Sequence, residues 1–193
     1  MLRSSSRHRW LWPVGAFCLA SALLSALLPT ERPALASTLA ADHLVGSYRF
    51  VGGQREVRQV ERAIDEVVAE MSFFIRGMAS RRLKALNLPA DELRIFTEGV
   101  NITVARSGQP DISAPADGSP ITWRNPDNGN VLKVTHRVYP DGTLKQRLVG
   151  DRGVSENVFD LNDNGRLTMS TSIEAEKLPS HIRFATTYVR RDR

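Results

Sequence analysis

The feature that most constrains the fold of this chain is a series of short alternating segments between Val131 and Arg190. Apolar and polar residues alternate along each segment, which is the period of a strand with one buried face. Tight-turn sequences separate the segments, among them Asp141-Gly142, Asp151-Arg152-Gly153 and Asn164-Gly165. Because such turns join neighbouring antiparallel strands, this half of the chain predicts an antiparallel meander.

In the segment before the meander, the spacing of the apolar residues changes twice. Residues 44–51 alternate like a strand, whereas residues 54–87 carry apolar residues at helical spacing. An unbroken helix of that length would reach roughly 50 Å, so we expect a break or bend near Gly77. The strand pattern returns as a hairpin over 93–104, and at most one short strand is expected around Ile112.

Together these patterns predict about nine strands with one helical insertion, 54–87, between the first and the second strand. The expected fold is mainly β (α+β), an antiparallel up-and-down β-barrel or a strongly curved meander sheet. Residues 37–193 are expected to form a single domain, since their number suits one hydrophobic core.

Residues 1–36 have the form of a secretory signal peptide. Arginines precede an apolar stretch over residues 10–28, and Ala34-Leu35-Ala36 is a small-x-small cleavage site before Ser37. We therefore expect export to the periplasm or the extracellular space. The apolar stretch is almost long enough to cross a bilayer, so an uncleaved anchor at residues 10–28 stays open as an alternative.

Cysteine content and charge argue against lipid attachment and against a nucleic-acid partner. Cys18 is the only cysteine, and it lies inside the apolar stretch behind the bulky Phe17, which argues against a lipoprotein signal. The whole chain carries 26 basic and 21 acidic residues; without residues 1–36 these numbers fall to 22 and 20. The exported part would therefore be nearly neutral, so we expect no nucleic-acid partner.

Three parts of the chain resemble the calycin group, which comprises the lipocalins and the fatty-acid-binding proteins. Leu44, Gly46 and Tyr48 form a Gly-x-aromatic strand at the start, residues 142–146 lie in the middle, and Tyr188-Val189-Arg190 ends the last strand. The resemblance implies a barrel with a helical insertion between its first two strands. In members that bind fatty acids, an Arg-x-Tyr pair on the last strand holds the ligand carboxylate, and here Thr186 stands at the arginine position.

Alternation along the meander places several polar residues on the same face as its apolar residues. These are His136, Gln146, Thr171, Thr186 and Tyr188. Buried polar groups need partners, so they predict either polar anchors of a ligand pocket or a network in which they bond one another. We expect the first arrangement to bind a hydrophobic small molecule or lipid, with Phe74 and Met78 at a lid.

The lid region has a second interpretation. Phe73 to Met78 form an apolar patch that would contact a ligand or a membrane as a lid, or would pack on the sheet as an ordinary amphipathic helix. Arg76, Arg81 and Arg82 could meet anionic lipid head groups, or form a solvated face.

Motifs for catalysis or for a resident metal are missing from the sequence. Residues 160–165 match the first half of a calcium loop, but Thr171 stands where the loop requires glutamate, so a hairpin turn is expected. The histidines are isolated, and no nucleophile motif occurs. We therefore expect a noncatalytic binding protein without cofactor or metal. An envelope interaction module with a helix-filled core is the first alternative, and an enzyme using His136 or His181 beside an acidic residue is the second.

Overall fold

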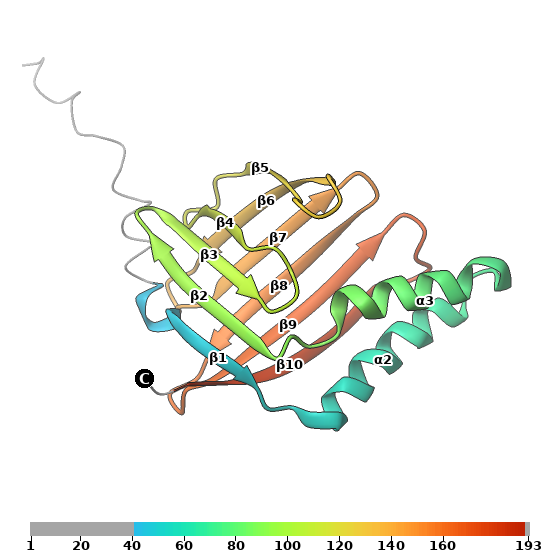
Figure 1. Ribbon diagram of the computed structural model, residues 1–193, viewed down its shortest axis with the longest axis horizontal. Helices are drawn as coiled ribbons and strands as arrows, with labels where there is room; N and C mark the ends of the chain where they lie inside the picture. The colour runs from blue at the N-terminus through green and yellow to red at the C-terminus, as the bar shows by residue number, and fades with distance from the viewer. Residues whose placement is uncertain (1–40, 192–193) are drawn as a thin grey trace, which may run out of the picture. The chain divides into compact units, whose positions relative to one another are not determined.

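The computed structural model describes residues 41–191, which form one antiparallel sheet and two α-helices (Figure 1). The elements in chain order are the 3-10 helix η1 (Asp42–Leu44), β1 (Gly46–Phe50), α2 (Gly53–Ala69), α3 (Phe73–Asn87), β2 (Glu92–Glu98), β3 (Asn101–Arg106), β4 (Ile112–Pro115), β5 (Ile121–Arg124), β6 (Val131–Val138), β7 (Leu144–Gly150), β8 (Gly153–Leu161), β9 (Arg166–Ala175) and β10 (Ile182–Arg190). The predicted signal peptide lies outside the described residues. Within 41–191, no helix has both the length and the apolar character needed to span a bilayer.

The ten strands follow the order β4-β3-β2-β1-β10-β9-β8-β7-β6-β5, and every neighbouring pair is antiparallel. The residues after β4 bring the sheet back to β6, because the amide of Val138 donates to the carbonyl of Ala116 at 3.0 Å and Gly118 donates to His136 at 2.8 Å. The sheet is therefore a nearly closed up-and-down barrel, which confirms the predicted fold class. The strand beyond the predicted nine is β4, the short strand at Ile112.

The helical insertion breaks at a different place from the one predicted. The break lies between α2 and α3 at residues 70–72, whereas Gly77 lies inside α3. Ser72 has extended backbone angles, φ −54° and ψ 136°, which end the helical path. Arg76 stabilises this turn, because its Nη2 donates to the free carbonyls of Ala69 at 2.5 Å and Met71 at 3.1 Å.

Two apolar clusters lie on the inner face of the barrel. The first cluster, here called the closed-end core, lies at the end of the barrel that η1 covers. It contains residues from η1 and most strands: Ala41, Leu44, Tyr48, Leu93, Ile95, Ile102, Val104, Ala116, Val138, Leu144, Phe159, Leu167, Met169 and Tyr188. The second cluster, here called the mouth core, joins the apolar stripe of α2 to the end of β9 and the start of β10. It contains Val60, Ile64, Val67, Val68, Ile173, Ile182 and Phe184. Full burial of such side chains is worth about 1.5–3 kcal/mol each, so the mouth core holds α2 firmly on the barrel.

The closed end is shut by an arginine from the last strand. Arg190 lies over the ring of Tyr48, 5.5 Å from the ring centroid, and donates to the Tyr48 hydroxyl at 3.0 Å and to the carbonyl of His43 in η1. A Cβ atom at Gly46 would lie only 3.2 Å from Arg190 Nε. Glycine at this position therefore leaves room for the arginine to cross β1, which explains the Gly-x-aromatic pattern.

Candidate functional site

Four polar side chains form a hydrogen-bonded row across the interior, here called the polar belt. They stand directly opposite one another on β9, β8, β7 and β6: Thr171, Asn157, Gln146 and His136. Thr171 Oγ1 donates to Asn157 Oδ1 at 2.8 Å, and Asn157 Nδ2 donates to Gln146 Oε1 at 2.9 Å. Gln146 Nε2 lies 2.9 Å from His136 Nε2, and His136 Nδ1 lies 2.9 Å from the carbonyl oxygen of Ile102 on β3. Every side chain in the row is buried.

The hydrogen bonds of the belt fix the tautomer of the His136 imidazole. The Ile102 carbonyl can only accept, so Nδ1 carries the proton and Nε2 accepts from the Gln146 amide. Burial lowers the pKa of His136 to about 4, and the hydrogen bond to Ile102 only partly opposes this. His136 is therefore neutral at pH 7, and all donors in the belt point in one direction.

Three of the predicted anchors thus bond one another in the belt. Gln146 bonds His136 directly, and Asn157, which the sequence prediction missed, joins Gln146 to Thr171. Alternation with the buried Phe159 on β8 could have placed Asn157 on the inner face. The belt matches the second of the two predicted arrangements, an internal network.

The other two anchors, Thr186 and Tyr188, behave differently. Together with Arg106 they form a group that we call the Tyr188 cluster. Thr186 Oγ1, the Tyr188 hydroxyl and Arg106 Nε are all shielded from solvent, and none of them makes a hydrogen bond of ordinary geometry. Burial raises the pKa of Tyr188, although the nearby Arg106 charge, Thr186 and the Ala90 backbone oppose the shift. The cluster therefore holds three unsatisfied polar atoms inside the barrel.

Neighbouring elements fix the Tyr188 cluster in place. The ring of Phe50 packs edge-on against Tyr188, with 5.7 Å between the centroids. Glu56, in the first turn of α2, accepts hydrogen bonds from Thr187 N at 2.7 Å and from Thr187 Oγ1 at 2.8 Å. The cluster thus lies where β1 ends and α2 begins. Sequence analysis missed Arg106, although alternation with Ile102 and Val104 on β3 was available to place it on the inner face.

The predicted lid residues lie on the surface. Phe73, Phe74 and Met78 on α3 are 81%, 92% and 70% exposed, so the alternative that this patch packs on the sheet is wrong. α3 has no buried residue, and it is fixed to α2 by Asp65, which accepts from Ser80 and pairs with Lys84. Phe74 and Met78 therefore do not lie with the interior polar residues.

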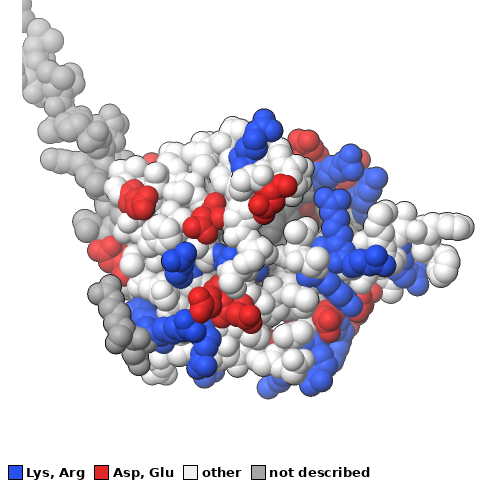
Figure 2. Space-filling view, viewed as in Figure 1, with Lys and Arg blue, Asp and Glu red and all other residues white. Residues whose placement is uncertain are grey.

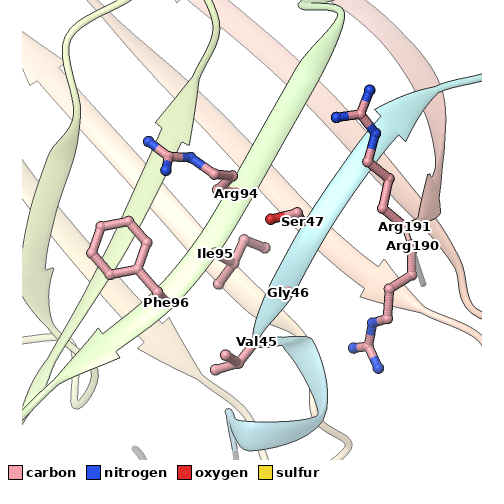
Figure 3. A pocket seen from close by; sticks show the side chains of 8 residues that line it. All are labelled: Val45, Gly46, Ser47, Arg94, Ile95, Phe96, Arg190 and Arg191. Carbon is pink, nitrogen blue, oxygen red and sulfur yellow. The ribbon is translucent and has the colours of Figure 1, made fainter. Parts of the chain in front are cut away.

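The surface of the described residues includes two hollows. The first, of about 750 Å³, is lined by residues 45–47, 94–96, 190 and 191, and Figure 3 shows Arg94 and Arg191 on either side of Ser47. The second, of about 380 Å³, lies along β8, β9 and β10 and includes Thr171 and Phe184. Neither hollow is lined by Arg106, Thr186 or Tyr188.

The nearly closed up-and-down barrel, the two helices between its first strands and the Gly46-Tyr48-Arg190 closure define a calycin-like β-barrel. Solved structures of similar fold include a Schistosoma mansoni fatty acid binding protein in complex with arachidonic acid (11% identity, TM-score 0.47), with 79% of this chain and 99% of that chain covered. A variant of the fluorescent protein UnaG has 11% identity and a TM-score of 0.43, with 77% of this chain and 96% of that chain covered. As-p18, an extracellular fatty acid binding protein, has 9% identity and a TM-score of 0.42, with 79% of this chain and 99% of that chain covered. No protein-family model and no curated protein matches the sequence.

Proposed function

We propose that this chain is an exported, noncatalytic binding protein that holds a hydrophobic or amphipathic molecule, such as a lipid or fatty acid, inside its barrel. The observation that carries this proposal is the contrast between the two interior polar groups. The belt is bonded from end to end, whereas the hydroxyls of Thr186 and Tyr188 are buried without partners. An unpartnered buried polar group costs about 1–3 kcal/mol, and a bound ligand atom would remove that cost.

In this proposal the two kinds of interior residue have separate tasks. Burial of the ligand's hydrocarbon chain supplies most of the affinity, at about 0.8 kcal/mol per methylene group. Thr186 and Tyr188 then fix the orientation of its polar end. His136, Gln146 and Thr171, which belong to the belt together with Asn157, maintain the barrel wall rather than serve as the main anchors.

An interaction module without a ligand is the alternative with the best support. The mouth core seats four α2 side chains against Ile173, Ile182 and Phe184, as a permanently filled barrel would require. An enzyme has weaker support: His181 Nε2 lies 3.6 Å from Glu174 Oε2, but both side chains are exposed, and neither described hollow is lined by them.

Native mass spectrometry tests the proposal directly. The full chain is expressed in a bacterium and recovered from the periplasm without detergent. We expect a protein mass that corresponds to cleavage after Ala36, together with an adduct of lipid mass that is lost on denaturation. A bare protein that also fails to take up fluorescent fatty-acid probes would favour the interaction module, and an uncleaved chain in the membrane fraction would favour the anchor.

We also propose that α3 is the surface through which the protein meets a membrane. The exposed apolar residues Phe74 and Met78 share α3 with the exposed Arg81 and Arg82. Arg76 has a structural task instead, because its guanidinium bonds the end of α2. Figure 2 shows basic side chains gathered over the helical end, beside its uncharged tip. Apolar residues flanked by arginines suit an anionic bilayer surface.

A vesicle flotation assay checks the role of α3. Replacing both Arg81 and Arg82 by glutamine is expected to weaken binding to phosphatidylglycerol-containing vesicles by about tenfold or more, since each arginine near such a surface contributes about 1 kcal/mol. Phe74→Ser should weaken binding as well. Val131→Ser, at an exposed apolar position on β6, is the matched control and should bind like the parent. Equal binding to neutral and anionic vesicles would contradict the role of the arginines.

A further inference from the structure

The larger of the two hollows lies where β1 meets β2 and the end of β10 (Figure 3). Ser47 on β1 stands opposite Arg94 on β2, and from the other side the amide of Arg191 donates to the Ser47 carbonyl at 2.8 Å. Ser47 and Arg94 alternate with the buried Tyr48 and Leu93, so they belong to the outer face of the sheet. Arg94, Ser47 and Arg191 are all exposed, and they form a row across three neighbouring segments, here called the outer arginine row.

The spacing of this row leaves room for a ligand between two cations. Neighbouring strands lie about 4.8 Å apart, so the backbones of Arg94 and Arg191 are about 10 Å apart, with Ser47 between them. Figure 3 shows the two arginine side chains on either side of Ser47. Because serine is small and arginine is long, both guanidinium groups can reach an anion above Ser47, whose hydroxyl adds a donor at the centre.

The charge around the outer arginine row is unbalanced. Among the described residues no acidic side chain lines the hollow, whereas Arg94, Arg190 and Arg191 all do. Arg190 is committed to closing the end of the barrel, and Arg94 takes part in none of the ion pairs of the described residues. Arg191 Nη1 pairs with Glu92 at 2.5 Å. An exposed ion pair is worth only about 0–1 kcal/mol, so Glu92 is a weak competitor for Arg191.

We propose that the outer arginine row binds a phosphate group, with Arg94 and Arg191 as the two counter-charges and Ser47 as a further donor. A phosphate monoester carries nearly two negative charges at pH 7, and a guanidinium donates two parallel hydrogen bonds to its oxygens. Two guanidinium groups therefore match its charge. The half-buried Val45 and Phe96 line the same hollow and offer a surface for a small apolar group on the phosphate. The site lies outside the barrel, so it does not depend on whether the interior holds a ligand.

Titrations followed by NMR test the site on the protein obtained from the full chain. Phenyl phosphate is expected to bind at least about tenfold more tightly than the uncharged phenol, because charge-assisted hydrogen bonds form only with the phosphate. It should shift the amide signals of Ser47, Arg94 and Arg191. Arg94→Gln should weaken phenyl phosphate binding by about tenfold, since one of the two counter-charges is lost.

Two further variants show whether the arginines act on the ligand. Glu92→Gln removes the competitor of Arg191 and should tighten phenyl phosphate binding by about twofold or more, a gain that a merely structural role would not produce. Arg183→Gln is the matched control: Arg183 is exposed, lies opposite Ser172 near the start of β10 and does not line the hollow, so this variant should bind like the parent.

Three results would overturn the phosphate site. They are equal affinity for phenyl phosphate and phenol, unchanged binding in Arg94→Gln, and no gain in Glu92→Gln. Dihexanoyl phosphatidic acid, used below its micelle concentration, identifies the source of the phosphate. Shifts of the same three amides at lower concentrations than with phenyl phosphate would assign the site to a lipid headgroup, and weaker or absent shifts would assign it to a soluble phosphate ester.

Discussion

Replacing Gln146 by leucine is expected to lower the free energy of unfolding by about 2–5 kcal/mol. Gln146 is the central link of the polar belt, bonding His136 on one side and Asn157 on the other. Leucine would leave both partners buried with an unsatisfied polar atom, and each such atom costs about 1–3 kcal/mol. Because a domain of this size is stable by only about 5–15 kcal/mol, urea denaturation at neutral pH should show a large shift of the midpoint.

A matched replacement on the neighbouring strand separates loss of the belt from a general effect of leucine. Lys133 is exposed on β6, and Lys133→Leu should change the stability by less than about 0.5 kcal/mol. A Gln146→Leu protein as stable as the parent would show that the belt does not hold the barrel together. If that variant also lost ligand while keeping its stability, Gln146 would be a ligand anchor after all.

Acidification is expected to destabilise the protein through His136. The pKa of His136 is about 4 in the folded chain against 6.5 for the free side chain, so the unfolded chain binds a proton first as the pH falls. The stability is therefore complete above about pH 6.5 and decreases between 6.5 and 4. The total loss is about 3 kcal/mol, since each pKa unit is worth about 1.4 kcal/mol. The main cause is burial, which disfavours the charged imidazole. A protonated Nε2 would also face the Gln146 amide nitrogen, which is itself a donor.

Urea denaturation at several pH values between 7.5 and 4 measures this loss. His136→Gln removes the titrating group, so its stability should depend less steeply on pH than that of the parent across this range. His181→Gln removes an exposed histidine and should keep the parent's slope. A parent protein with flat stability from pH 6.5 to 4.5, or a His136→Gln slope equal to the parent's, would contradict the role of His136.

The sequence predicted the secondary structure well where the spacing of apolar residues alone determines it. Alternation and turn residues predicted the meander, and the switch to helical spacing placed the insertion between the first two strands. The break between the helices was misplaced, because it depends on the backbone of Ser72 and on Arg76 capping α2, neither of which periodicity reports. The exposure of Phe74 was also unpredictable, since an apolar stripe does not show whether a partner element covers it.

The candidate site was only partly predictable for a related reason. Alternation identifies which residues point inward, and it correctly placed His136 and Tyr188 inside. It does not show which inward residues meet across the barrel. The partnership of His136 with Ile102 joins β6 to β3 where the barrel closes. The approach of Arg106 to Tyr188 joins β3 to β10, which are separated by two strands in the sheet. Neither contact follows from alternation within one strand.

The position of the polar belt also divides the stability of the barrel into two parts. Along β9, Met169 belongs to the closed-end core, Thr171 to the belt and Ile173 to the mouth core. The four buried residues of α2 all belong to the mouth core, so releasing the helix is expected to expose mainly that cluster. The helical end is therefore expected to open as a unit of local unfolding, at a fraction of the free energy needed to unfold the whole chain.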